Sequence, residues 1–143
     1  MEFSKIIAVT GKPGLFEILS QTKNSVIVKS LTDGKRLPIT ATHNVSLLEN
    51  IAIYTYETEV PLATIFKTIA NKEDNKATMS HKENGKKLEA YFEEILPDYD
   101  TDRVYVSNIK KVIQWYNLLA NAEFDFSKLA IEETKEEEEE SAS

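Results

Sequence analysis

The sequence predicts an α+β protein: a small five-stranded β-barrel in residues 1–57, a three-helix domain in residues 58–126 and a disordered acidic tail in residues 127–143. Three observations support this division. Short β-branched runs alternate with turn residues in the first part, and a helical apolar spacing occurs three times in the second. From about Ser127 the apolar period is lost. The 41% share of hydrophobic residues is sufficient for a packed core.

The first part contains five runs that are typical of short strands. They are KIIAVTGKPG (5–14, a strand and its turn), LFEILSQ (15–21), SVIVKSL (25–31), KRLPIT (35–40) and IAIYTY (51–56). Pro38 cannot donate a backbone hydrogen bond, so the fourth strand is predicted to lie at an edge. Ser46 and Glu49 have the spacing of a capping box, which predicts one helical turn before the fifth strand. This pattern is typical of an SH3-like barrel.

The second part carries three amphipathic helices. Each has apolar residues at positions i, i+3, i+4 and i+7, and the matching stripes predict a shared core. The stripes are Leu62, Ile65, Phe66 and Ile69; Leu88, Tyr91, Phe92 and Ile95; and Ile109, Val112, Ile113 and Tyr116. Pro61 suits the start of the first helix, Pro97 ends the second and Ser107 is the expected N-cap of the third. The polar stretch 71–87 between the first two helices predicts a mobile linker.

The acidity of the chain is concentrated in its tail. The net charge is −7, and Glu132 to Glu140 contribute seven glutamates and one lysine, which leaves 17 acidic and 16 basic residues elsewhere. Such a tail usually keeps a chain solvated, and it can also shield a basic surface on the same chain or on a partner. The nearly neutral body argues against a non-specific nucleic-acid binder, which needs a basic face.

Residue types exclude several kinds of chemistry. The chain has no cysteine, so a disulfide framework, a thiolate metal site and a cysteine nucleophile are excluded. His43 and His81 stand alone, without a second ligand at metal spacing and without a catalytic triad. No N-terminal signal and no run of about 20 apolar residues is present, so we expect a cytoplasmic protein without a membrane partner.

Two short motifs resemble ligand loops and fail their requirements. In DYDTD (98–102) the acids alternate as in a calcium loop, but Arg103 stands where glycine is needed and Ile109 where glutamate is needed. We expect a polar loop in which Asp100 or Asp102 pairs with Arg103. GKPG (11–14) precedes a strand rather than a helix, which favours a hairpin turn over a phosphate loop. We therefore expect no cofactor, no structural calcium or zinc and no enzymatic activity.

The only tryptophan of the chain, Trp115, lies at the edge of the apolar stripe of the third helix. Leu118 falls outside that stripe and shares a side of the helix with Lys111 and Trp115. Two interpretations are open. In the first, Trp115 is buried against the barrel and Leu118 covers it. In the second, Lys111, Trp115 and Leu118 form an exposed patch that binds a partner, since aromatic anchors dominate interfaces.

Two stretches resemble a bacterial family of short uncharacterised proteins. They are VTGKPGLFEILSQTKNSVIVKSLTDGKR and YFEEILPDYDTDRVYVSNIKKVIQWYNLL, and the resemblance spans about residues 1–122. Members of this family join two domains of unknown function. The resemblance implies a cytosolic protein with a small β domain and a helical domain, and it transfers no functional residue.

Three functional hypotheses follow. The first is a non-enzymatic interaction module in which barrel and helices present a composite surface to a protein or nucleoprotein partner. The second is nucleic-acid binding through barrel loops that carry Lys12, Lys23, Lys35 and Arg36, with Lys110 and Lys111 as further contacts. The third is an enzyme that uses acids such as Glu93 and Asp100. The near-neutral body and the presence of only two arginines disfavour the second.

Overall fold

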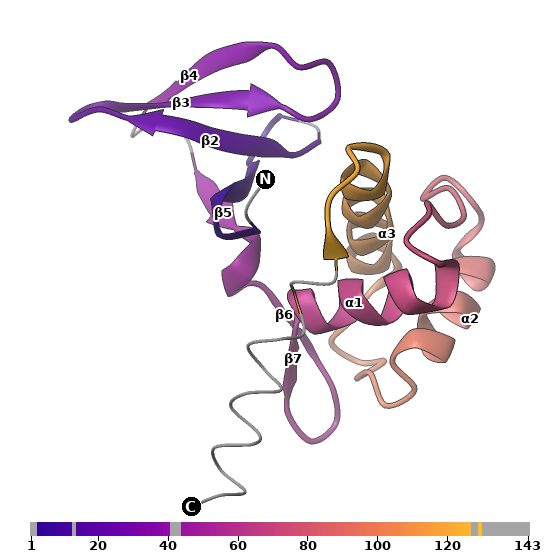
Figure 1. Ribbon diagram of the computed structural model, residues 1–143. Coiled ribbons are helices and arrows are strands. Elements are labelled where there is room, and N and C mark those ends of the chain that lie inside the picture. The colour runs from indigo at the N-terminus through magenta and orange to yellow at the C-terminus, as the bar shows by residue number, and fades with distance from the viewer. Residues whose placement is uncertain (1–2, 13, 41–43, 127–128, 130–143) are drawn as a thin grey trace, which may run out of the picture.

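The protein has an α+β fold, as the sequence predicts (Figure 1). A computed structural model describes residues 3–12, 14–40, 44–126 and 129. Within these ranges it contains a five-stranded antiparallel sheet, a separate two-stranded hairpin and three α-helices. The predicted disorder of the tail lies outside the described residues, with the exception of Leu129.

The order of the five-stranded sheet is β4-β3-β2-β1-β5. Its strands are β1 (Ile6–Val9), β2 (Phe16–Gln21), β3 (Ser25–Ser30), β4 (Arg36–Thr40) and β5 (Val45–Leu47). The first four coincide with predicted strands. Pro38 lies in β4, which is an edge strand, so the prediction made from its missing N–H is confirmed.

The predicted fifth strand forms, but it does not join the five-stranded sheet. Instead of IAIYTY, the short β5 pairs with β1 at the sheet edge. Within IAIYTY, β6 (Ala52–Tyr54) pairs with β7 (Glu59–Pro61) in the separate hairpin. The predicted helical turn before this strand is the 3-10 turn η2 (Leu48–Asn50). Its predicted cap is wrong, because Ser46 lies in β5 and the N-cap residue is Leu47, which forms no side-chain cap. Three-residue strands such as β5 carry too few side chains to give an alternating pattern.

The sheet is curved. Asn44 adjoins the β5 edge, where its carbonyl oxygen accepts a 2.9 Å hydrogen bond from the backbone N–H of Thr10, while Thr40 ends β4 at the other edge. Four residues span at most about 14 Å, but the edges of a flat five-stranded sheet lie about 19 Å apart. The sheet must therefore curl so that its edges approach each other. Pairing among the described residues leaves β4 and β5 as edges, so a closed barrel is not confirmed.

The three helices share one core, as predicted. They are α1 (Leu62–Glu73), α2 (Gly85–Ile95) and α3 (Val106–Asn121), and all twelve residues of the predicted stripes are buried in a single cluster. The predicted N-cap of α3 is wrong. Tyr105 occupies that position, and its backbone N–H donates to the side-chain oxygen of Asn108 at 2.9 Å, whereas Ser107 lies inside the helix. Because the Asn108 side chain accepts this hydrogen bond from the residue three positions earlier, the helix starts before Ser107.

The polar stretch 71–87 is not a free linker. Its first and last three residues belong to α1 and α2. Between the helices, the backbone N–H of Thr78 donates to the side-chain oxygen of Asn117 at 2.8 Å, and the Asn117 amide donates to the carbonyl of Met79 at 3.0 Å. The Tyr116 hydroxyl donates to the carbonyl of Lys76 at 2.7 Å. Polar groups of α3 thus anchor a connection that the sequence pattern predicts to be mobile.

The main core crosses the predicted boundary between the two parts. Ile6, Leu15 and Leu48 from the sheet region and Ile53 from β6 join the helical cluster. The inner face of the sheet has its own small cluster of Ile7, Val9, Phe16, Val28 and Ile39. The predicted boundary at 57/58 falls between β6 and β7, and the domain limits themselves stay a prediction.

The C-terminal end of the core extends further than the sequence predicts. Phe126 is 1% exposed and stacks on Tyr116 with ring centroids 4.9 Å apart, and Leu129, which was assigned to the tail, is 7% exposed. Leu129 therefore belongs to the main core cluster, and the limits of the tail stay a prediction. Beyond α3 the apolar residues no longer follow a helical period, which is why the pattern does not reveal them.

Tyr116 should be the most sensitive aromatic position of this core. Tyr116→Ala removes a fully buried ring, and we expect the free energy of unfolding to fall by about 3–5 kcal/mol. Tyr116→Phe keeps the ring and removes only the hydrogen bond to Lys76, at a cost of about 1 kcal/mol. Urea unfolding of both variants measures the difference, and equal losses would contradict a packing role for the ring.

Burial raises the pKa of three core tyrosines, Tyr91, Tyr99 and Tyr116. Burial, followed by the hydrogen bond that the Tyr91 hydroxyl donates to the Glu73 carboxylate at 2.6 Å, raises the pKa of Tyr91. Burial, followed by the nearby charge of Glu73, raises the pKa of Tyr116 to about 12. In each case the folded state holds a proton that the unfolded chain loses near the ordinary tyrosine pKa of about 10.

The contribution of Tyr91 and Tyr116 to the free energy of unfolding should therefore be lost in alkaline solution. Below about pH 10 both states keep these protons and the contribution is fully present. As the pH rises towards 12, the free energy of unfolding should fall by at most about 1.4 kcal/mol per pH unit for each tyrosine. Denaturant unfolding at a series of alkaline pH values tests this. Tyr91→Phe and Tyr116→Phe should each flatten the decline, and an unchanged decline in both would show that other groups cause it.

Candidate functional site

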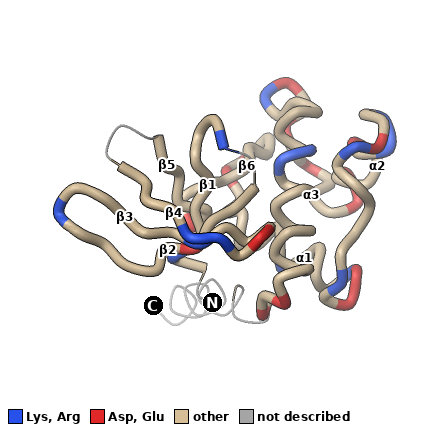
Figure 2. The backbone as a smooth tube through the Cα atoms, turned by 90° about the horizontal axis from the view of Figure 1, so that it is seen from above, with Lys and Arg blue, Asp and Glu red and all other residues tan. Residues whose placement is uncertain are grey.

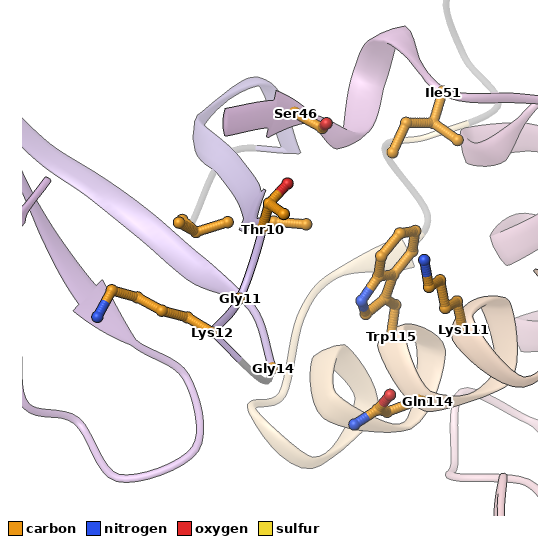
Figure 3. Close-up of a pocket in the computed structure, with 11 residues that line it drawn as sticks. Thr10, Gly11, Lys12, Gly14, Ser46, Ile51, Lys111, Gln114 and Trp115 are labelled. Atoms are coloured by element: carbon orange, nitrogen blue, oxygen red, sulfur yellow. The ribbon is translucent and has the colours of Figure 1, made fainter. Parts of the chain in front are cut away.

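A groove separates the sheet from α3. It consists of two adjoining pockets of about 320 and 590 Å³. Both are lined by Lys12 and Gly14 from the β1–β2 turn and by Gln114 from α3. Figure 3 shows Trp115 and Lys111 rising from α3 toward Ile51, with the β1–β2 turn across the smaller pocket. We call the two pockets together the sheet–α3 groove.

The groove unites the two sets of residues that the sequence assigns to alternative sites. Lys111 and Trp115 line the smaller pocket, Lys12 lines both, and the larger pocket is lined by Lys35, Arg36 and Leu118. Lys23 lies apart, exposed in the turn between β2 and β3. Lys110 is exposed on α3 and does not line either pocket. Sequence reasoning did not identify four further residues that line the smaller pocket, because no regular spacing in the sequence relates them to one another. They are Thr10, Ser46, Ile51 and Gln114.

The burial of Trp115 and Leu118 falls between the two interpretations drawn from the sequence. Both side chains are half-buried and pack against the main core, while Lys111 is exposed. Trp115 is therefore neither enclosed nor part of an exposed apolar patch. One side of each residue stabilises the contact between helix and core, and the other side lines the groove.

Gly14 allows the β1–β2 turn to approach Thr32 in the turn between β3 and β4 closely. Its φ is +84°, and a Cβ atom at this position would lie 3.1 Å from Thr32 Oγ1 and 3.8 Å from Leu118 Cδ1. Any other residue here would be strained and would press on the groove wall. The chain continues from this turn into β2 rather than into a helix, so the hairpin interpretation of GKPG is confirmed.

The groove is locally cationic. Its lining includes four cationic residues, Lys12, Lys35, Arg36 and Lys111, and one acidic residue, Asp33, which gives the lining a net charge of +3. Asp33 also accepts a 2.9 Å hydrogen bond from the backbone N–H of Lys35. Across the molecule the charges are mixed, and Figure 2 shows lysines and arginines over both halves with acidic residues among them. The positive character is thus a local property of the groove.

Asp100 and Glu93, two further candidates from the sequence, do not line the groove. Asp100 pairs with Arg103 as predicted, with Oδ2 and Nε 3.5 Å apart. Glu93 is exposed on α2, and His43 lies outside the described residues. Among the residues that the structure describes, no group of three or more His, Cys, Asp or Glu side chains is arranged to hold a metal ion. Within the same ranges, none of the helices combines the length and apolarity that crossing a membrane requires.

Leu118→Lys tests the half-buried position of the groove wall. We expect the free energy of unfolding to fall by about 1–2 kcal/mol, because full burial of a leucine contributes about 1.5–3 kcal/mol. Urea unfolding, with Tyr116→Ala as the buried reference, measures this. A loss within about 0.5 kcal/mol would indicate an exposed position, and a loss equal to that of Tyr116→Ala would indicate a fully buried one.

Comparison with known proteins identifies both parts of the chain. Residues 3–48 match a family described as a domain of unknown function (DUF5606), and residues 51–119 match another described as a domain of unknown function (DUF6852). No curated protein matches the chain. A solution NMR structure of a structural-genomics target from Bacteroides vulgatus is 40% identical, with a TM-score of 0.72 over 87% of this chain and 91% of that chain. The resemblance to a family that joins two domains of unknown function is thus confirmed, and this protein belongs to the same family as the Bacteroides vulgatus protein.

Proposed function

We propose that the protein is a non-enzymatic interaction module whose sheet–α3 groove binds an acidic segment of a partner protein. The observation that carries this proposal is the combination of half-buried Trp115 and Leu118 with four cationic side chains around one groove. An apolar side chain of the partner would contact the indole and the leucine, and flanking carboxylates would pair with the cations. Aromatic anchors surrounded by polar groups are typical of interface hot spots.

The architecture favours an SH3-like β domain as part of this module. The sheet order β4-β3-β2-β1-β5 and the curl required between Thr40 and Asn44 are both compatible with a small barrel. In such a domain, loops at the barrel rim provide a binding surface. Here the β1–β2 turn and the turn before β4 line the groove, and α3 supplies its other wall.

A protein partner is favoured over nucleic acid on electrostatic grounds. Outside Glu132 to Glu140 the chain carries 17 acidic and 16 basic residues, so long-range attraction of a polyanion is weak. Lys23, one of the cations of the nucleic-acid hypothesis, also lies outside the groove. Single-stranded nucleic acid that stacks a base on Trp115 is the alternative occupant, because stacking on an aromatic ring tolerates any base.

Trp115 is a built-in reporter of groove binding, since it is the only tryptophan of the chain. A short peptide with one leucine flanked by glutamates should change its fluorescence on titration. Lys35→Glu combined with Arg36→Glu should weaken this binding by about tenfold, which corresponds to 1.4 kcal/mol. The control variant combines Lys23→Glu with Lys82→Glu, which changes the net charge equally at exposed positions outside the groove. It should bind the peptide as the natural protein does.

Equal losses in the groove variant and the control variant would show that only net charge matters, and would contradict a groove site. Titration with a mixed-sequence oligonucleotide tests the nucleic-acid alternative. If it binds more tightly than the peptide, with a slope of log affinity against log salt of about −3, as four single-strand phosphate contacts predict, the nucleic-acid alternative is correct.

A further inference from the structure

A second surface lies at the end of the molecule away from the β2–β4 part of the sheet, where the β6–β7 hairpin projects (Figure 1). Tyr54 and Tyr56 on this hairpin are 42% and 62% exposed, and Tyr105 at the start of α3 is 63% exposed. Among the described residues these are the three exposed tyrosines, and the other large exposed hydrophobic residues, Leu19 and Val45, lie in the sheet. Tyr54 and Tyr56 share one hairpin, and Tyr105 follows two residues after Arg103, which contacts Tyr54. Exposed aromatic rings of this kind indicate an interaction surface.

The surface is held in place by backbone pairing. The N–H of Tyr56 donates to the carbonyl of Asp98 at 3.1 Å, and the N–H of Asp100 donates to the carbonyl of Tyr54 at 2.9 Å. The Tyr56 hydroxyl lies 2.9 Å from the hydroxyl of Thr101. The loop between α2 and α3 therefore extends the hairpin on one side. A partner would meet rings that are already ordered, which lowers the entropic cost of binding.

One of these rings already has a cationic partner, Arg103. Its guanidinium lies over the ring of Tyr54, 5.1 Å from the centroid, and Asp100 holds it with a 3.5 Å ion pair. A cation over a tyrosine face is attracted by the ring quadrupole. Tyr105 follows Arg103 by two residues, and the rings of Tyr56 and Tyr105 have no such partner among the described contacts. They remain accessible to a cation supplied from outside.

The charges around the tyrosines have the complementary sign. Residues 54–59 and 98–105 carry five carboxylates and one arginine, a net charge of −4. The carboxylates belong to Glu57, Glu59, Asp98, Asp100 and Asp102. Asp100 forms an ion pair with Arg103, and the other four acidic residues are exposed. An anionic partner would be repelled here, whereas guanidinium groups could stack on the rings and pair with the carboxylates.

We propose that the surface around Tyr54, Tyr56 and Tyr105, which we call the tyrosine face, binds an arginine-rich segment of a partner protein through the rings of Tyr56 and Tyr105. This surface shares no residue with the sheet–α3 groove and has the opposite charge, so it does not depend on the groove. Binding requires ring faces for the guanidinium groups and carboxylates for charge pairing. Arginine should therefore be preferred over lysine, whose compact ammonium is more strongly hydrated.

The test uses the full chain and a short peptide of alternating arginine and glycine. At physiological ionic strength, NMR titration should shift the amides of residues 54–59 and 98–105, and a peptide with lysine in place of arginine should bind more weakly. Tyr56→Ala combined with Tyr105→Ala should weaken binding by about tenfold, whereas the corresponding Tyr→Phe changes, which keep both rings, should preserve it. Leu19→Ala, a change at an exposed residue of the sheet, is the matched control and should have no effect.

Because Tyr56 contacts Thr101, the alanine variant needs an independent check. Glu57→Lys combined with Glu59→Lys leaves every ring in place and should also weaken the arginine peptide. No binding of that peptide, amide shifts confined to other regions, or equal losses in the phenylalanine and alanine variants would each overturn the proposal. Concentration-dependent dimers in sedimentation that Tyr56→Ala and Tyr105→Ala abolish would overturn it in favour of a second copy of the chain.

Discussion

The burial of one face of α3 is the constraint on which the rest of the structure depends. Tyr116, at the centre of that face, lies 6.2 Å from the ring of Phe66 on α1 and 4.9 Å from Phe126 beyond α3, measured between ring centroids. Its hydroxyl also fixes the connection between α1 and α2 at Lys76. With this face committed to the core, the rotation of about 100° per residue directs the other side chains of the helix. Asn117 then reaches the α1–α2 connection, and Trp115 and Leu118 line the groove.

The sequence predicts those features that depend on local repetition. The apolar stripes of the three helices recur at the helical period, and each stripe residue is buried as expected. Four sheet strands are bounded by glycine, asparagine or aspartate turns, and Pro38 marks the edge strand through its missing donor. In each case a few adjacent residues determine the outcome. The family resemblance likewise rests on two continuous stretches of sequence.

Features that depend on distant contacts are not predictable in this way. β5 has three residues, and only its pairing with β1 makes it a strand, while IAIYTY has a stronger β pattern and forms a hairpin with β7 instead. Asn117 lies outside the apolar stripe of α3, and the folded chain gives it two backbone partners in the α1–α2 connection. The candidate site shows the same limit. Trp115 and Lys12 were each identified, yet only the fold shows that they line one pocket.

The distribution of charge gives a nearly neutral body two local surfaces of opposite sign. The groove lining carries a net charge of +3, and the segments that bear the tyrosine face carry −4. At physiological ionic strength charges are screened beyond about 8 Å, so a partner responds to the nearest surface rather than to the sum over the chain. Net charge therefore excludes strong long-range attraction of polyanions but not local recognition of either sign. Both surfaces are built where two parts of the fold meet, and the selectivity that we propose for them depends on the same core that positions α3.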